Sequence, residues 1–350
     1  MTKKERVALA INHKEPDKVP KGEIAIDGSL TKKLIGADRY DQLGPLGSEL
    51  AARELLNMDI AFVNDFPIKV VGQTDEGYDI IQGPFGNQMV DNGKSSHNYK
   101  PLVDDIEDAD NYHVPDMNWC PTDKLDFYKE NSDMYVVAQI GGPASNVYLC
   151  MGMEDYMVYS LTNTKEVGII AERIMEYEVK RAKKFLDHGA DAILIADDIA
   201  FNSGPFLPPA IMDQIVYPYL KWAVKEIKKY KDVPVFMHTD GYVYDVMDKI
   251  VECGFDGLQS LQPSSGMDIA KIKANYGKDL CLMGNIDLDY LLTFGSPQEV
   301  EDEVKRVIDI AAPGGGFILS SCNILVDIVK PENVLAMYNC AEKYGVYGRR

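Results

Sequence analysis

The sequence has 350 residues, of which 46% are hydrophobic and 26% charged, and its formal net charge is −19. This composition is typical of a globular protein, and it offers neither an apolar run long enough to span a bilayer nor a basic stripe for nucleic acid, so we exclude membrane insertion and nucleic-acid binding. The six cysteines are scattered without a CxxC pair and the N-terminal segment has no apolar signal core, so we expect reduced thiols and a cytoplasmic protein.

Two strands are predicted in the first part of the chain. The first, residues 23–27 (EIAID), follows an amphipathic helix, and the second, residues 59–63 (DIAFV), follows a helix around residues 45–57. A long insertion comes next, at about residues 64–130. Its turn residues separate alternating runs, so we predict a β-hairpin and a loop there rather than a second domain.

From about residue 131 the pattern becomes regular, because short β-branched runs alternate with amphipathic helical stretches. Six runs are predicted as strands, at residues 135–139, 192–196, 233–237, 257–260, 280–283 and 316–320. The clearest helices are predicted at residues 165–188, 208–230 and 298–311. Strand–helix alternation implies a parallel sheet, and eight such strands close a barrel. The predicted fold class is therefore α/β, a (β/α)8 TIM barrel formed by residues 1–350 as one domain, with an insertion after the second strand.

In such a barrel, the side chains at the carboxyl ends of the strands face the active site. The strand assignment alone selects the polar residues Gln139, Asp197, Asp198, His238, Asp240, Gln259, Asn285, Asp287, Cys322 and Asn323. We predict that the two adjacent aspartates and the histidine act in catalysis, namely Asp197, Asp198 and His238. The amides, with Asp287, are predicted to bind substrate, namely Gln139, Gln259, Asn285, Asp287 and Asn323.

Three of these residues have the chemistry of metal ligands. His238 directly follows the predicted strand VPVFM, and Asp240, two residues further, can share one face of an extended segment with it. Cys322 emerges from the last predicted strand. A histidine, a carboxylate and a thiolate that converge there would suit Zn2+ and leave a fourth position open for substrate.

Each candidate also has a purely structural interpretation. A single histidine at a strand end is often a hydrogen-bonded wall residue, and spacing alone favours that interpretation of His238 over zinc. Asp197 and Asp198 could be a helix cap and a solvated carboxylate, while Asn285 and Asp287 could only form a turn.

These same segments resemble the uroporphyrinogen decarboxylase superfamily over nearly the whole chain. The matching pieces are Arg6 with EPDKVP at 15–20, ADDIA at 196–200, GPF at 204–206, HTDG at 238–241, GNID at 284–287, GGGFILS at 314–320, PEN at 331–333 and YG at 344–345. The superfamily contains true decarboxylases and corrinoid-linked methyltransferases. The resemblance therefore implies one of these two activities on a barrel fold.

The arginines separate the two branches. The decarboxylases bind a substrate with many carboxylates and have an arginine-rich signature after the first strand. Here that stretch is IDGSLT, residues 26–31, which has no arginine, and none occurs between Arg53 and Arg173. Porphyrinogen decarboxylation is therefore disfavoured, and the methyltransferase branch is more similar.

The resemblance to that branch implies cofactors. Its coenzyme M methyltransferases bind zinc through a His-x-Cys pair and a later cysteine, and His238 and Cys322 match the first and last of these positions, while Asp240 stands in the middle one. A carboxylate donates less electron density than a thiolate, so we expect a harder zinc that acts as a Lewis acid on a methylated oxygen. The implied partners are a small O-methyl substrate and a corrinoid protein whose cobalt exchanges the methyl group at the barrel mouth.

Two alternatives from other functional classes stay open. One is a metal-free (de)carboxylase or lyase with Asp198 as its central carboxylate, and the other is a non-catalytic binding protein on the same scaffold. The sequence also leaves open whether the chain forms a homodimer.

Overall fold

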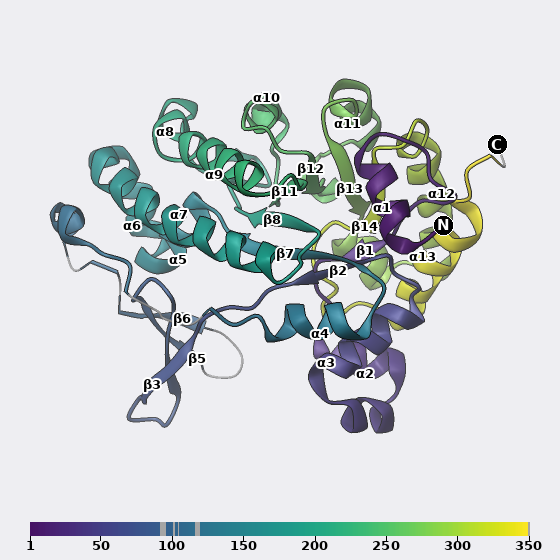
Figure 1. The fold of residues 1–350 in the computed structure, drawn as a ribbon, viewed down its shortest axis with the longest axis horizontal. Helices are drawn as coiled ribbons and strands as arrows, with labels where there is room; N and C mark the ends of the chain where they lie inside the picture. The colour runs from purple at the N-terminus through teal and green to yellow at the C-terminus, as the bar shows by residue number, and fades with distance from the viewer. Residues whose placement is uncertain (92–95, 101, 104, 116–119, 349–350) are drawn as a thin grey trace.

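The computed structural model describes residues 1–91, 96–100, 102–103, 105–115 and 120–348. Its main sheet has eight parallel strands in chain order (Figure 1). They are β1 (Gly22–Glu23), β2 (Ile60–Val63), β7 (Tyr135–Gly141), β8 (Ala192–Ala196), β11 (Val235–Thr239), β12 (Gly257–Ser260), β13 (Cys281–Ile286) and β14 (Phe317–Ser321). Parallel bridges from Lys21 to Leu319 and from Ile26 to Leu325 bring the last strand back to the first. The predicted (β/α)8 barrel is confirmed.

Two strand boundaries differ from the prediction in ways that matter for the site. β11 continues past Met237, because His238 and Thr239 still pair with Gln259 and Ser260 of β12. The first strand is shorter than predicted and ends at Glu23. Asp27, predicted in that strand, instead caps the next helix, since its Oδ1 accepts the Ser29 N–H at 2.7 Å.

Helices surround the barrel on its outside (Figure 1). They are α1 (Lys3–Ile11), α2 (Gly28–Ile35), α3 (Ala37–Leu55), α4 (Asp123–Asn131), α5 (Pro143–Met151), α6 (Met153–Thr162), α7 (Thr164–Asp187), α8 (Pro209–Ile215), α9 (Tyr217–Tyr230), α10 (Met247–Glu252), α11 (Ile269–Tyr276), α12 (Pro297–Ala311) and α13 (Pro331–Tyr344). The 3-10 helices η1 (Ile106–Asn111), η2 (Tyr244–Val246) and η3 (Pro263–Ser265) and the π-helix η4 (Leu288–Leu292) complete the set. The helix predicted at 208–230 is broken at Val216, because Pro218 cannot donate the backbone hydrogen bond that would continue it. No helix in the described part of the chain is long and apolar enough to cross a membrane.

The barrel interior is filled by alternate residues of the strands. Ile60, Phe62, Tyr135, Val137, Ala192, Leu194, Phe236, Cys281, Met283 and Ile318 form one buried cluster with Val7, Ala10 and Ile11 of α1. This helix therefore closes the amino end of the barrel, and a second buried cluster lies between the strands and the outer helices. Because side chains alternate along a strand, the inner face continues toward the carboxyl ends through Gln139, His238 and Gln259.

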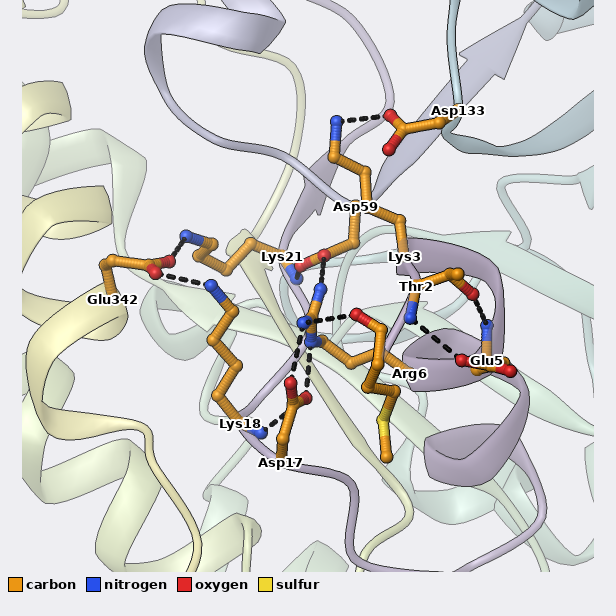
Figure 2. Close-up of polar contacts among 11 residues, drawn as sticks. Thr2, Lys3, Glu5, Arg6, Asp17, Lys18, Lys21, Asp59, Asp133 and Glu342 are labelled. Carbon is orange, nitrogen blue, oxygen red and sulfur yellow. Dashed lines mark hydrogen bonds and ion pairs between the residues drawn. The ribbon is translucent and has the colours of Figure 1, made fainter.

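Ion pairs hold α1 at the amino end of the barrel. Figure 2 shows Arg6 between two carboxylates: its Nη1 lies 2.6 Å from Asp59 Oδ1, next to β2, and its Nε lies 2.7 Å from Asp17 Oδ1. Asp59 also accepts the Lys21 N–H at 2.9 Å. Arg6 and its loop, which carry part of the family resemblance, are therefore structural here and lie at the end opposite the strand carboxyl ends.

The insertion after β2 folds into a sheet of its own, to one side of the barrel (Figure 1). Four antiparallel strands form it: β3 (Lys69–Gln73), β4 (Asp79–Gln82), β5 (Gln88–Asp91) and β6 (Ser96–Lys100). This sheet is larger than the predicted β-hairpin. The parts of the insertion at residues 92–95, 101, 104 and 116–119 lie outside the described residues. A further short antiparallel pair, β9 (Ala200–Phe201) and β10 (Gly204–Pro205), follows β8.

Candidate functional site

Three side chains converge at the carboxyl end of the barrel in the geometry of a metal site. Asp198, His238 and Asp240 each offer one ligand atom, and these atoms all lie within 4.8 Å of one another. His238 Nε2 is 3.7 Å from Asp198 Oδ1 and 4.0 Å from Asp240 Oδ2. A divalent cation could therefore contact one nitrogen and two carboxylate oxygens, which are donors that zinc accepts.

The order of the strands brings these residues together. β8 and β11 are neighbours in the sheet, and Ala196 pairs with His238, so the chain after β8 emerges beside the histidine. The Asp240 N–H then donates to Asp198 Oδ1 at 3.1 Å. Gly241 follows with a φ of +84°, a left-handed conformation that favours glycine and turns the chain after Asp240. Strand pairing and this turn fix the spacing of the two carboxylates.

The imidazole of His238 is oriented by a buried glutamine. Gln259, fully buried on the neighbouring strand β12, points its Oε1 at His238 Nδ1 and donates its amide N–H to the Ser321 carbonyl at 3.3 Å. Because the amide nitrogen is engaged by Ser321, the oxygen faces the ring, which places the imidazole proton on Nδ1. The lone pair on Nε2 is then directed toward Asp198 and Asp240, as a metal ligand requires.

Asp240 lies in a setting that disfavours its negative charge. Burial raises the pKa of Asp240, and the charge of Asp198 raises it further, against the opposing effect of His238. Its Oδ2 accepts the Asn323 amide, but its buried Oδ1 has no hydrogen-bond partner among the described residues. The single proton of the Ser260 hydroxyl goes to the Cys322 carbonyl instead. A bound cation would relieve the repulsion between the two carboxylates.

Cys322 does not belong to this group. The described cluster, whose ligand atoms lie within 4.8 Å of one another, consists of His238, Asp240 and Asp198. The sequence analysis predicted Cys322 as the third member. Burial raises the pKa of the Cys322 thiol to about 12, with further increases from Asp287, Asp240 and Asp289, against one backbone hydrogen bond from Leu288 that lowers it. Without a metal the thiol is therefore protonated at neutral pH, and a cation that bound it would have to displace this proton. The described cluster shares His238 and Asp240 with the predicted ligand set and has Asp198 as its third residue.

Asp197, predicted as catalytic, is fully buried away from the cavity. Its Oδ1 accepts the Ser145 N–H at 2.6 Å, at the first turn of α5. Burial raises the pKa of Asp197 to about 7, although the backbone N–H groups of Ser145 and Ala144 lower it. The structure therefore matches the helix-capping interpretation, in which Asp197 binds the N-terminus of α5 and only Asp198, with its side chain 37% exposed, reaches the site.

The position of Asp197 predicts a pH effect on stability. Its folded-state pKa of about 7 lies above the ordinary aspartate value of 3.8, so folding takes up a proton between these values. The contribution of this group to the unfolding free energy therefore falls as the pH rises from about 4 to 7, and stays low above that. Asp197→Asn, which cannot ionise, should match the wild type near pH 4 and exceed it by a few kcal/mol (roughly) at pH 8.

Urea unfolding at a series of pH values measures this difference. The exposed Asp232, changed to asparagine, provides the control and should leave the pH dependence unaltered. If the Asp197→Asn and wild-type curves run parallel from pH 4 to 8, the carboxylate is not buried as described.

The other predicted substrate-binding residues fall into two groups. Gln139, on β7, is half-buried on the inner face of the barrel, and Asn323 lies beside the site, where it contacts Asp240. Asn285 is buried and donates to the Leu261 carbonyl at 2.7 Å, while Asp287 caps η4 by accepting the Tyr290 N–H at 2.8 Å. Asn285 thus lies within β13 and links it to the segment after β12, whereas Asp287 holds a local turn, as the turn-former interpretation expects.

A cavity of about 580 Å3 adjoins the two carboxylates. Its lining, in the described part of the chain, consists of Tyr148, Asp198, Ala200, Phe201, Asn202, Ser203, Phe206 and Asp240. The ring centroids of Phe201 and Phe206 lie 4.4 Å apart, and Tyr148 meets Phe206 edge-on at 6.0 Å. The sequence analysis assigned no role to these aromatic residues. Their position directly after β7 and β8 is the signal that could have found them.

Comparisons with known proteins agree with this architecture. A family model described as "Uroporphyrinogen decarboxylase (URO-D)" matches residues 88–344, more than half of the chain. The methylcobamide:CoM methyltransferase MtbA of Methanosarcina acetivorans is 25% identical over 219 residues, which span 62% of this chain and 60% of that protein. The uroporphyrinogen decarboxylase of Chlorobium limicola is 28% identical over 179 residues, 50% of this chain and 46% of that protein.

A solved structure described as a methyltransferase from Methanosarcina mazei superposes with a TM-score of 0.75 at 20% identity, covering 98% of this chain and 99% of that one. This likeness concerns the fold. The matches to the curated relatives span about 60% of their length or less, and they include both methyltransferases and decarboxylases. On the family match over residues 88–344, the chain belongs to the uroporphyrinogen decarboxylase family.

Proposed function

We propose that this protein is a methyltransferase that moves a methyl group between a small O-methyl substrate and the cobalt of a partner corrinoid protein, with zinc as a Lewis acid. The observation that carries the proposal is the cluster of Asp198, His238 and Asp240 beside an open cavity. Relatives in the same family are methylcobamide:CoM methyltransferases. The cavity lining described above has no lysine or arginine, so it is unsuited to a substrate with many carboxylates.

The residues present fit a zinc ion. The two crowded carboxylates of Asp198 and Asp240 are groups that a cation would stabilise, and Gln259 keeps the Nε2 lone pair of His238 free to bind it. We therefore assign His238, Asp198 and Asp240 as the ligands, in place of the set with Cys322. When bound, zinc would supply Lewis acidity to the oxygen from which the methyl group departs.

The protein side chains have three tasks in this reaction. The rings of Tyr148, Phe201 and Phe206 hold the apolar part of the substrate and exclude water from one side of the cavity. Asn323 holds Asp240 in place through its amide. Asp198, exposed at the edge of the cavity, can position the substrate oxygen or exchange a proton with it. The corrinoid protein would approach from the open side of the barrel.

Two oxygen ligands favour an O-methyl substrate over a thioether. Carboxylate oxygens are harder donors than thiolates, so the bound metal keeps more positive charge and binds oxygen in preference to sulfur. Three ligands from the protein also leave a coordination position for the substrate, as catalytic zinc sites require. The substrate class and the ligand set thus depend on each other in this proposal.

A methyl-transfer assay tests the proposal. The zinc-loaded protein, mixed with a panel of small methyl ethers and a corrinoid protein in the Co(I) state, should convert the visible spectrum to that of methyl-Co(III). No methyl transfer is expected when zinc is left out, because the proposed Lewis acid is then missing, or when the corrinoid protein is left out, because the proposed methyl acceptor is then missing.

The alternatives give different results in the same experiment. Release of CO2 from a carboxylic acid by the metal-free protein would indicate the lyase, and the absence of turnover with every methyl donor would favour a binding protein. Methyl transfer that survives His238→Ala would refute the proposed metal centre.

A further inference from the structure

The barrel closes at a seam between β1 and β14 that has a gap in its backbone hydrogen bonds. β1 has only two residues. Two backbone N–H groups, one in β14 and one in the loop after it, donate to carbonyls next to β1: Leu319 N–H to Pro20 at 2.9 Å and Leu325 N–H to Ala25 at 3.0 Å. Between them, Ser321 N–H finds no backbone acceptor in the first strand and donates instead to the Glu23 side chain.

Glu23 fills this gap with its carboxylate. Its Oε1 accepts the Ser321 N–H at 2.8 Å, and its Oε2 lies 2.7 Å from the Ser321 hydroxyl. Tyr338, from α13, donates its hydroxyl to the same carboxylate. Glu23 is fully buried, and it lies on the outer side of the strands, outside the cavity. Burying an ionisable group opposes folding unless it is hydrogen-bonded, and these three contacts offset that cost.

Ser321 in turn contacts both arms of the metal site. Its carbonyl accepts the Gln259 amide at 3.3 Å, and Gln259 orients His238. Its hydroxyl lies 2.6 Å from the Asn323 carbonyl, and Asn323 holds Asp240. Two successive hydrogen bonds through Ser321 therefore connect the Glu23 carboxylate to Gln259 and to Asn323. These two residues orient two of the three proposed ligands.

We propose that Glu23 is a positioning residue that sets the orientation of His238 and Asp240 through Ser321. This inference rests on the proposed metal centre. Glu23 itself lies on the outer face of the barrel, where it touches neither metal nor substrate. Its physical basis is that β14 ends at Ser321, which pairs with Ile286 of β13 on one side, whereas on the side of β1 the Glu23 carboxylate takes the place of a backbone acceptor for its N–H.

The test compares four forms of the full chain: wild type, Glu23→Ala, Glu23→Gln and Asp59→Asn. Glutamine can accept the Ser321 N–H and donate to the Ser321 hydroxyl, so it should preserve the geometry, whereas alanine removes it. Asp59 is an equally buried carboxylate at the amino end of the barrel, and it has no described contact with Ser321. It controls for a general loss of stability.

The first readout is the zinc affinity, measured by competition with a chromogenic chelator. Glu23→Ala should bind zinc about 10–100-fold more weakly than wild type, as is usual when an outer partner of a ligand is lost. The zinc affinities of Glu23→Gln and Asp59→Asn should stay within about threefold of the wild-type value, a change smaller than the lower limit of that range. A wild-type affinity in a folded Glu23→Ala protein would overturn the proposal.

The second readout needs no metal. In the zinc-free protein, 15N correlation spectra of the histidine rings, with His238 identified by His238→Gln, should show the Nδ1–H tautomer in wild type, Glu23→Gln and Asp59→Asn. Glu23→Ala should show a mixture of tautomers. If the wild type binds no zinc but Glu23→Ala still changes this signal, the metal centre fails and the positioning role stands. If Glu23→Ala does not fold, Ser321→Ala replaces it, and an unchanged zinc affinity and tautomer in that variant overturn the proposal.

Discussion

Replacing Asp198 by alanine is expected to lower the zinc affinity strongly. Loss of a residue that only hydrogen-bonds to a metal ligand lowers the affinity roughly 10–100-fold, and loss of the proposed ligand Asp198 should lower it further. Asp198 Oδ1 lies 3.7 Å from His238 Nε2 and belongs to the group of three convergent ligand atoms. Its removal leaves two protein ligands, which is too few for a catalytic zinc site. Methyl transfer should fall with the metal content, and both are measured on protein purified without added zinc.

Cys322→Ala is the matched comparison. Its thiol is buried, and its sulfur is not among the convergent atoms. This variant should keep its zinc and lose only the packing of a small side chain. The opposite pattern, with zinc lost in Cys322→Ala and kept in Asp198→Ala, would restore the ligand set implied by the family resemblance.

Gly241→Ala is expected to destabilise the protein by roughly 2–4 kcal/mol and to abolish zinc binding. A Cβ at this position would lie 2.6 Å from the Ala200 carbonyl oxygen and 2.7 Å from that of Phe201, and both are backbone atoms that cannot move aside cheaply. The φ of +84° adds strain for any residue other than glycine. Any relief must shift Asp240, the preceding residue. Urea unfolding and metal analysis of the same samples measure both effects.

Gly77 provides a control for the strain alone. It has the same φ of +84°, in the turn between β3 and β4, and nothing lies within 4 Å of the position its Cβ would take. Gly77→Ala should therefore cost only about 1 kcal/mol, from the left-handed backbone, and leave zinc binding intact. Equal losses of stability in the two variants would show that the contact with Ala200 and Phe201 does not constrain the site.

Much of the fold could be predicted from local sequence patterns. The β-branched runs and the amphipathic helices have different periods, and the barrel strands that follow the insertion are observed within two or three residues of their predicted bounds. The departures have local causes that the pattern does not contain. Asp27 caps a helix instead of extending the first strand, and Pro218 breaks a helix that was predicted as continuous.

The sequence by itself determined that polar residues gather at the carboxyl ends of the strands, because side-chain alternation and parallel pairing follow from the order of the elements. It placed His238 and Asp240 together for this reason. It also supplied both interpretations of Asp197, but the choice required knowing that the first turn of α5 meets this carboxylate, a contact between residues about 50 positions apart.

Only the tertiary structure decided which third residue joins His238 and Asp240. β8 lies next to β11 in the sheet, so Asp198 emerges beside the histidine, whereas the chain after β14 brings the side chain of Asn323, and not that of Cys322, to Asp240. Distances across a barrel depend on strand tilt and stagger and on the conformation of each loop, and no short-range pattern encodes them. The same reason hides Gln259, Ser321 and Glu23, whose roles arise from contacts between strands far apart in the chain.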